Sequence, residues 1–310
     1  MALSLLRPPS LTPPVRQVLR RMAPGLLGAG VTQINLAVDV VIASLLPSGA
    51  VSYLYYADRV AQLPLGVVGA ALATAMLPLL SRQLRAGQRL SAHRSMNRGT
   101  ELALLLTLPS AVGLAAASGP IVAALFQRGA FSAEAAAASA AALVAYAFGL
   151  PAFVLVKVFA PGFFARGDTA TPVKIGLVAV ALNLALNLLF MQWLAHVGVA
   201  LATACAAWVN AGLLAWMLAR RGHLVADRRS RRVLPRILAA SLAMGAVVVG
   251  LAWLLPAADG SAARAVRAAL LIGAGAGAYL AAGVALRAFN VREVLGMLRR
   301  RGRAKPSAPV

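Results

Sequence analysis

The sequence predicts an all-helical integral membrane protein, a bundle of about eight transmembrane helices. Of its 310 residues, 61% are apolar and only 12% are charged, and the mean hydropathy is +0.80. An ordinary soluble domain carries about twice that share of charged residues. The apolar residues also fall in runs of roughly 20 or more, the length that a helix needs to cross the hydrocarbon core of a bilayer.

Eight apolar runs are predicted to span the membrane. They cover residues 24–46, 51–80, 100–126, 133–164, 172–194, 197–219, 234–255 and 265–289. Several exceed the minimum length, which predicts tilted or kinked helices. Prolines in or beside the runs remove backbone donors, as in the broken helices of transporters: Pro64, Pro109, Pro120, Pro151 and Pro161. Ser132 is expected to cap the fourth run, and Thr171 with Pro172 the fifth.

The basic residues predict the orientation of the chain in the membrane. The net charge is +22, and most arginines fall in the predicted loops after the second, fourth and sixth runs and in the tail. The loops on the other side hold only Arg128, Arg264 and Arg267. The positive-inside rule then places both termini in the cytoplasm, with residues 1–23 as a basic lead-in and 291–310 as a basic tail. No aromatic residues interleave the basic ones, which argues against nucleic acid as a partner.

No catalytic chemistry is indicated. The single cysteine, Cys205, lies inside an apolar run and supports neither a disulfide framework nor a metal site. Walker A, G-x-S-x-G, H-E-x-x-H and dinucleotide-binding motifs are all missing from the sequence. We therefore expect a protein that is not an enzyme.

Three charged residues lie deep inside the first two runs. A charge at membrane depth costs at least about 2.5–3.5 kcal/mol, so such residues usually face a cavity or a partner. Asp39 shares a helix face with Thr32 and Asn35, which precede it by seven and four positions. Asp58 and Arg59 are adjacent and point about 100° apart, so each is expected to find a partner on another helix or to reach water at a helix end.

Two further polar groups suggest binding chemistry. Asn183 and Asn187 share a helix face, and with Asp39, Thr203 and a backbone carbonyl they could form an all-oxygen site for a small hard cation. The alternative is that the asparagines only hydrogen-bond between helices. Lys157 is another intramembrane charge, which could contact a substrate phosphate, balance an acid or extend to the interface.

Several segments resemble a known family. They are QINLAVDVVIAS, LYYADRVAQLPLGVVGAALATAMLPLLSR, VKVFAPGFFARGDTATPVKI and GVALATACAAWVNAGLL. These segments resemble the MurJ/MviN lipid II flippases of the multidrug/oligosaccharidyl-lipid/polysaccharide exporter superfamily. Members have about fourteen spans, and this chain resembles the last eight. The resemblance implies a six-helix second lobe at 24–221 and two additional helices at 222–290 that form part of a groove for the lipid tail.

The resemblance also implies a function and a set of site residues. It implies a multi-pass protein of the bacterial inner membrane that moves lipid II, the undecaprenyl-pyrophosphate-linked peptidoglycan precursor, to the outer leaflet by alternating access. Arg59 matches a cavity arginine that faces the pyrophosphate, and Asp58 would be its neighbour in the cavity. The residues that match sodium ligands of the family are Asp39, Asn183, Asn187, Val199 through its carbonyl, and Thr203. Family members can carry aspartate in place of Asn187.

Other functions stay open at this point. One is export of another lipid-linked polysaccharide or of drugs within the same superfamily, although the YYADR–QLPLG segment argues against it. Another is a non-transporting membrane scaffold, because the chain matches only part of the fourteen-span fold. In either case the remaining half of the fold would be a partner. An enzyme acting on lipid-linked sugars would need a paired-acid or metal motif that the sequence lacks.

Overall fold

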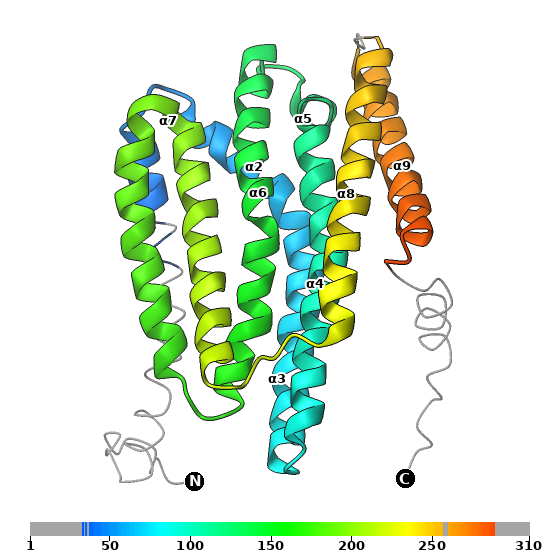
Figure 1. Ribbon diagram of the computed structural model, residues 1–310. Coiled ribbons are helices and arrows are strands. Elements are labelled where there is room, and N and C mark those ends of the chain that lie inside the picture. The colour runs from blue at the N-terminus through cyan, green and yellow to red at the C-terminus, as the bar shows by residue number, and fades with distance from the viewer. Residues whose placement is uncertain (1–32, 34, 36, 257–259, 289–310) are drawn as a thin grey trace, which may run out of the picture.

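The computed structural model describes residues 33, 35, 37–256 and 260–288, and the described chain is helical throughout (Figure 1). Helical residues 37–44 come first. The elements that follow are α2 (Ala50–Pro64), the π-helical η1 (Leu65–Gly69), α3 (Ala70–Arg85), α4 (Arg89–Ala116), α5 (Ser118–Phe126), α6 (Ala133–Phe164), α7 (Ala170–Arg220), α8 (Arg228–Leu254) and α9 (Ser261–Ala285). The predicted lead-in, tail and most of the first span lie outside the described residues.

Six of the described helices are long and apolar enough to cross a membrane, counting α2, η1 and α3 as one. The longest, α7, has 51 residues and contains both the fifth and the sixth predicted spans. The chain reverses at Ala195, whose φ of 47° and ψ of −128° are not helical, and Figure 1 shows α7 as two antiparallel limbs joined at one end. Gly198 sits beside this turn, where a Cβ atom would lie 2.5 Å from the Phe190 carbonyl oxygen.

Several predicted boundaries were wrong. The third span is two helices, because α4 ends at Ala116 and α5 begins after Ala117. The basic segment before it is helical rather than a loop: α3 runs to Arg85, α4 begins at Arg89, and only residues 86–88 connect them. Such extensions lie outside the apolar layer, so the hydropathy of the sequence does not indicate them. They are nevertheless helical, because arginine is a good helix former in water. Thr171 lies inside α7, which begins after Thr169.

The cap predicted at Ser132 is confirmed. Its side chain accepts a hydrogen bond from the Ala135 amide at 3.1 Å, which satisfies one of the free amides at the start of α6. The π-helical segment η1 directly follows Pro64, the proline predicted to disturb the second span. Proline has no amide hydrogen to donate to the preceding turn, and single wide turns are a common response inside an otherwise α-helical segment.

Helix α6 lies at the centre of the bundle and contacts α2, α3, α4, α5 and α7. Small residues allow these close approaches: a Cβ atom on Gly149 of α6 would lie 2.8 Å from the Cβ of Ala204 in α7. Helices α8 and α9 pack as a pair against α4 and α5 at one side of the bundle (Figure 1). Their outer surface exposes large apolar side chains, such as Trp253 at 88%, as expected of a surface that faces lipid.

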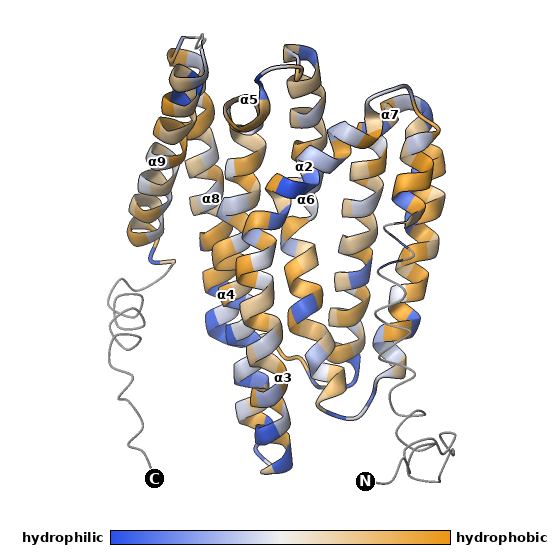
Figure 2. Cartoon of the chain, turned by 180° about the vertical axis from the view of Figure 1, so that it is seen from behind, coloured by the Kyte–Doolittle hydropathy of each residue, from blue (hydrophilic) through white to orange (hydrophobic). Residues whose placement is uncertain are grey.

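The two ends of the bundle differ in polarity. Figure 2 shows hydrophilic residues gathered at the lower ends of α3 and α4. The connections 86–88, 165–169 and 221–227 lie at that end, which we call the basic end. The opposite end carries the loop 127–132 and the turn at Ala195. The positive-inside rule uses such a difference in basic residues between the two ends to assign the orientation in the membrane.

Candidate functional site

The five residues expected to hold a cation come together in the structure. Asp39 Oδ1 accepts a hydrogen bond from Asn187 Nδ2 at 2.7 Å, and Asp39 Oδ2 accepts one from Thr203 Oγ1 at 3.1 Å. Thr203 Oγ1 lies 3.0 Å from the Val199 carbonyl oxygen, and the amides of Asn183 and Asn187 approach to 3.0 Å. We call this group the oxygen cluster.

The reversal in α7 explains how these residues meet. Asn183 and Asn187 stand one turn apart on the first limb, and Val199 and Thr203 stand one turn apart on the second. Because the limbs are antiparallel, Asn183 faces Thr203, and their side chains approach to 3.2 Å. The helical segment 37–44 then brings Asp39 over the seam between the limbs.

The chemistry of the oxygen cluster fits a small hard cation. Its side chains include one carboxylate and two amides, and Asn183 and Asn187 are only 1% and 0% exposed. The oxygen Oδ1 of Asn187 is buried without a hydrogen-bond partner among the described residues. One amide atom of Asn183 lies 3.0 Å from Asn35 Oδ1 and 3.1 Å from Asp39 Oδ1, so Asn35 belongs to the same group. Sodium-sized cations prefer carboxylate, amide and carbonyl oxygens of this kind.

Among the described residues, the contacts of Asp58 and Arg59 lie within α2 rather than on other helices. Asp58 accepts a hydrogen bond from Gln62, one turn further along α2. The Arg59 guanidinium lies over the ring of Tyr55, one turn earlier, at 4.7 Å from the ring centre. Residues four apart on a helix are neighbours on its surface, so both contacts are available without a second helix.

Arg59 lies on an exposed polar face of α2. Tyr55 is 52% exposed, and Arg59, Gln62 and Gly66 are exposed along the same face. The cation–π contact uses none of the five donors of the Arg59 guanidinium, and no hydrogen bond from them is seen among the described residues. The face is therefore able to bind an anion within the membrane-crossing region.

Lys157 lies further along the bundle, on α6, against the π-helical segment. A Cβ atom on Gly69 would lie 3.0 Å from Lys157 Cδ and 3.1 Å from its Nζ. The glycine therefore leaves room for the lysine side chain across η1. Helices bend at π turns, so the segment η1 marks a point at which this span can bend.

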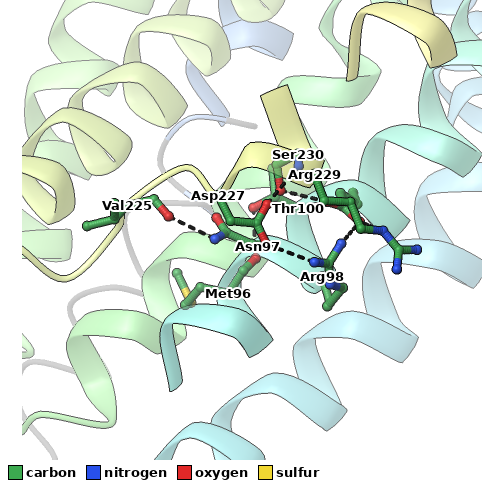
Figure 3. Close-up of polar contacts among 9 residues, drawn as sticks. Met96, Asn97, Arg98, Thr100, Val225, Asp227, Arg229 and Ser230 are labelled. Atoms are coloured by element: carbon green, nitrogen blue, oxygen red, sulfur yellow. Dashed lines mark hydrogen bonds and ion pairs between the residues drawn. The ribbon is translucent and has the colours of Figure 1, made fainter. Parts of the chain in front are cut away.

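A second buried polar group, which the sequence did not reveal, joins α4 to the start of α8 (Figure 3). Glu101 is 7% exposed, forms an ion pair with Arg98 and accepts a hydrogen bond from Ser230 Oγ at 2.6 Å. Arg98 also reaches Asp227 at 2.8 Å, and Arg229 approaches Glu101 at 3.8 Å. We call this group the clasp, and it also includes a hydrogen bond of 2.8 Å from Asn97 to the Val225 carbonyl.

The clasp fixes the entry into α8. Asp227 is the N-cap residue, and its carboxylate accepts a hydrogen bond from the Ser230 amide at 2.7 Å. Burial opposes ionisation of Asp227, but the Ser230 hydrogen bonds and the nearby Arg98 outweigh it and lower its pKa. Two acidic and two basic side chains then balance within the clasp, a composition typical of a structural joint.

A smaller ion pair closes the basic end of α7. Asp168 Oδ2 lies 2.5 Å from Arg221 Nη1, and Asp168 accepts hydrogen bonds from the amide and the hydroxyl of Thr171 at 2.9 and 2.7 Å. Burial opposes ionisation of Asp168, but these hydrogen bonds and the charge of Arg221 outweigh it and lower its pKa to about 2. The contact ties the loop before α7 to the residue that follows its last turn.

Comparison with known proteins relates the chain to one family. A model of the family described as lipid II flippase MurJ matches residues 2–259. A probable lipid II flippase MurJ of Rhizobium meliloti (strain 1021) is 46% identical over 268 residues, which are 86% of this chain and 50% of that protein. One from Vibrio cholerae is 37% identical over 275 residues, 87% of this chain and 52% of that protein. The chain thus spans about half the length of the curated relatives it matches.

Solved structures give the same relation. A structure of lipid II flippase MurJ in an inward closed conformation is similar with a TM-score of 0.73 and 25% identity, over 92% of this chain and 57% of that one. An outward-facing multidrug resistance transporter of the MATE family has a TM-score of 0.59 and 17% identity, over 87% of this chain and 65% of that one. The second similarity shows the fold alone.

Proposed function

The chain belongs to the MurJ lipid II flippase family, a family of membrane transporters rather than enzymes, and we propose that it forms the second lobe of a lipid II flippase. In this role it moves the undecaprenyl-pyrophosphate-linked peptidoglycan precursor from the cytoplasmic to the outer leaflet of the bacterial inner membrane. The basic end faces the cytoplasm, as the arginine distribution favours. The observation that carries the proposal is the exposed guanidinium of Arg59 at membrane depth on α2.

Arg59 supplies the chemistry that such a substrate needs. A pyrophosphate cannot cross hydrocarbon unaided, because a buried charge without a partner is very costly. A guanidinium stays charged and donates to phosphate oxygens in pairs. The contact of the Arg59 guanidinium with the Tyr55 ring uses none of these donors. Asp58 is tied back to Gln62 beside it, which keeps the acidic group from competing for the guanidinium.

Transport requires two lobes that rock about the bound head group. The residues 24–221 supply one lobe, and a first lobe like the one that occupies the rest of the relatives' length supplies the other. Helices α8 and α9 lie beside the lobe and expose apolar surface on which the lipid tail can run. Lys157 and η1 provide a bending point and a second cation along the route.

The oxygen cluster is the proposed sodium site. Asp39, Asn183, Asn187, Thr203 and the Val199 carbonyl would hold the ion. A bound cation compensates the charge of Asp39 and joins its helix to both limbs of α7. Asp39 precedes Asp58 by only 19 positions, and the short connection 45–49 joins their two helices. Cation binding that holds helix 37–44 in place can therefore also position the Arg59 face of α2.

The proposal is tested by complementation in bacteria depleted of their own flippase. The chain is expressed alone and together with the N-terminal half of the Rhizobium meliloti relative, and each format is repeated with Arg59→Ala. We expect rescue only with the added half, and loss of rescue with Arg59→Ala. The control is Arg94→Ala, at an exposed arginine of the basic end, which should still rescue.

Three outcomes would contradict the proposal or its assigned residue. Rescue by the chain alone would show that the second lobe needs no partner lobe. No rescue in either format, with the protein present in the membrane, would indicate a different substrate or a scaffold. Rescue that persists in Arg59→Ala would remove the proposed role of the guanidinium while leaving the family membership unaffected.

A further inference from the structure

An open pocket lies at the end of the bundle opposite the basic end. It has a volume of about 550 Å³ and lies between the first turns of α2, the end of α5 and the start of α6. Its polar and aromatic lining comes from Ser52, Tyr53, Tyr56, Phe126, Arg128 and Phe131. A volume of this size, with an aromatic lining and a few polar groups, is typical of sites for small ligands.

Three rings form the apolar wall of the pocket. The ring of Tyr56 lies 4.8 Å from that of Phe126 and 5.0 Å from that of Phe131, the latter in an edge-to-face arrangement. All three side chains are only partly buried, so their faces reach the pocket as well as the core. Partly exposed ring faces carry the negative part of the aromatic quadrupole, which attracts C–H groups with partial positive charge.

A tight turn places one guanidinium at the rim. The Arg128 amide donates to the Phe126 carbonyl at 2.7 Å, and the Phe131 amide donates to the Arg128 carbonyl at 3.2 Å. Gly129 inside this turn has a φ of 59°, a conformation that favours glycine. The side chain of Arg128 donates to the Leu125 carbonyl at 2.7 Å, which uses one of its five donors and holds the rest at the mouth of the pocket.

Ring contacts connect the wall of the pocket to Arg59 on α2. The Arg59 guanidinium stacks on Tyr55, and the Tyr55 ring meets the Tyr56 ring edge to face at 5.8 Å. Tyr56 in turn forms part of the pocket wall. Ring contacts therefore run without a break from the proposed pyrophosphate-binding guanidinium to the pocket, over about one helical turn of α2.

We propose that this pocket binds a sugar ring with a neighbouring anionic group, and that it receives the glycan part of the head group at the outer end of the lobe. The C–H face of the pyranose packs on Tyr56, Phe126 and Phe131, and Arg128 pairs with a carboxylate of the peptide attached to the sugar. Ser52 and Tyr53 supply hydroxyl groups for the sugar's own hydroxyls. The assignment rests on the proposed function and names a second contact of the same substrate.

The test measures binding of two lipid-free probes to the full chain in nanodiscs of phosphatidylethanolamine and phosphatidylglycerol. One probe is the disaccharide peptide of the precursor without lipid or pyrophosphate, and the other is uncharged N-acetylglucosamine. Equilibrium dialysis with labelled probes gives both affinities. Phe131→Leu should weaken both at least about tenfold, because it keeps an apolar side chain but removes a ring.

Arg128→Gln distinguishes charge recognition from packing. It leaves the apolar wall intact and should weaken only the anionic disaccharide peptide, by roughly tenfold. The matched controls are Arg267→Gln, an arginine that contacts the Ala252 carbonyl at 2.9 Å, and Phe148→Leu, an exposed ring outside the pocket. Both should bind like the wild type.

The outcomes separate the pocket from the function. Equal binding by Phe131→Leu and the wild type, or no saturable binding by the wild type, would contradict the proposal that the pocket binds a sugar. Selective loss in Arg128→Gln with unchanged controls would support it. Arg59→Ala should keep the lipid-free binding even where complementation is lost. Failed complementation with intact binding would therefore count against the proposed function alone.

Discussion

The clasp and the oxygen cluster are two buried polar groups of one bundle, and they differ in charge. The clasp joins α4 to α8 with two acids, Glu101 and Asp227, and two arginines, Arg98 and Arg229. The oxygen cluster joins helix 37–44 to α7 with one acid, Asp39, surrounded by neutral amides and a hydroxyl. One group is balanced within the described residues, and the other carries a negative charge that its own side chains leave uncompensated.

The difference in charge determines whether each group needs a bound ion to hold its helices together. A balanced network satisfies its own charges, so it can hold two helices together permanently. A cluster with surplus oxygen ligands holds its helices together best when a cation is present, so its strength depends on an external ion. The clasp should therefore respond to mutation but not to sodium, and the oxygen cluster should respond to both.

The largest expected effect is on the clasp. Glu101→Ala leaves Ser230 without its buried acceptor and removes one of the two acidic partners of the partly exposed Arg98, so it should lower the free energy of unfolding by about 2 kcal/mol. The measurement is thermal unfolding in detergent, followed by intrinsic fluorescence. The control is Glu134→Ala, an exposed acid in the first turn of α6, which should change little. Equal melting temperatures for both variants would show that the clasp contributes nothing.

The second-largest effect is expected when a negative charge is added to the oxygen cluster. Asn187→Asp introduces a second carboxylate where a buried amide oxygen has no hydrogen-bond partner in the part of the chain that the structure describes. It should tighten sodium binding roughly tenfold, equivalent to about 1.4 kcal/mol, because hard cations favour sites with more charge. Sodium titrations of the melting temperature would measure this shift, with Asn210→Asp on the second limb as control. Weaker sodium dependence in Asn187→Asp would contradict the assignment.

A smaller effect concerns the backbone anchor of the clasp. Asn97→Ala removes the hydrogen bond to the Val225 carbonyl, a group that water can reach once the side chain is gone. The loss should be about 1 kcal/mol. A double variant with Glu101→Ala should be less destabilised than the sum of the single variants, because both residues hold the same start of α8. Strict additivity in thermal unfolding would argue that they act independently.

The smallest effect is at the basic end of α7. The pKa of Asp168 is lowered to about 2 in the folded protein, so its contribution is fully present above about pH 4 and is lost as the pH falls toward 2. Since the ion pair with Arg221 is partly exposed, Asp168→Asn should cost less than about 1 kcal/mol at pH 7. Unfolding curves at pH 7 and pH 3 should show the gap between variant and wild type narrowing. A gap that widens at pH 3 would contradict this sign.

The sequence predicted the oxygen cluster better than the clasp, for a physical reason. Asn183 and Asn187 follow helical spacing, the sequence already suggested Asp39 and Thr203 as their partners, and the resemblance supplied Val199 as the carbonyl. Glu101 and Ser230 are separated by 129 positions, and each resembles an ordinary residue of a solvated helix end. Helical spacing does not relate such distant residues, so only the packing of α4 against α8 identifies the pair.

The same limit applies to the fold. Hydropathy located the apolar runs and the small residues that allow close packing. It missed the helical extensions at Arg89 and Arg228, because hydropathy is low wherever a helix leaves the membrane. It also missed the in-helix partners of Asp58 and Arg59, which the four-residue spacing to Gln62 and Tyr55 could have indicated.

The most direct measurement is the melting temperature of the full chain in sodium chloride and in potassium chloride at equal ionic strength. We expect sodium to stabilise the wild type, by about 2.7 kcal/mol at one hundred times its dissociation constant, and to have no effect on Asp39→Asn. Asp58→Asn, whose carboxylate lies outside the oxygen cluster, should keep the sodium effect. Equal stability of the wild type in the two salts, or sodium stabilisation that persists in Asp39→Asn, would contradict the account.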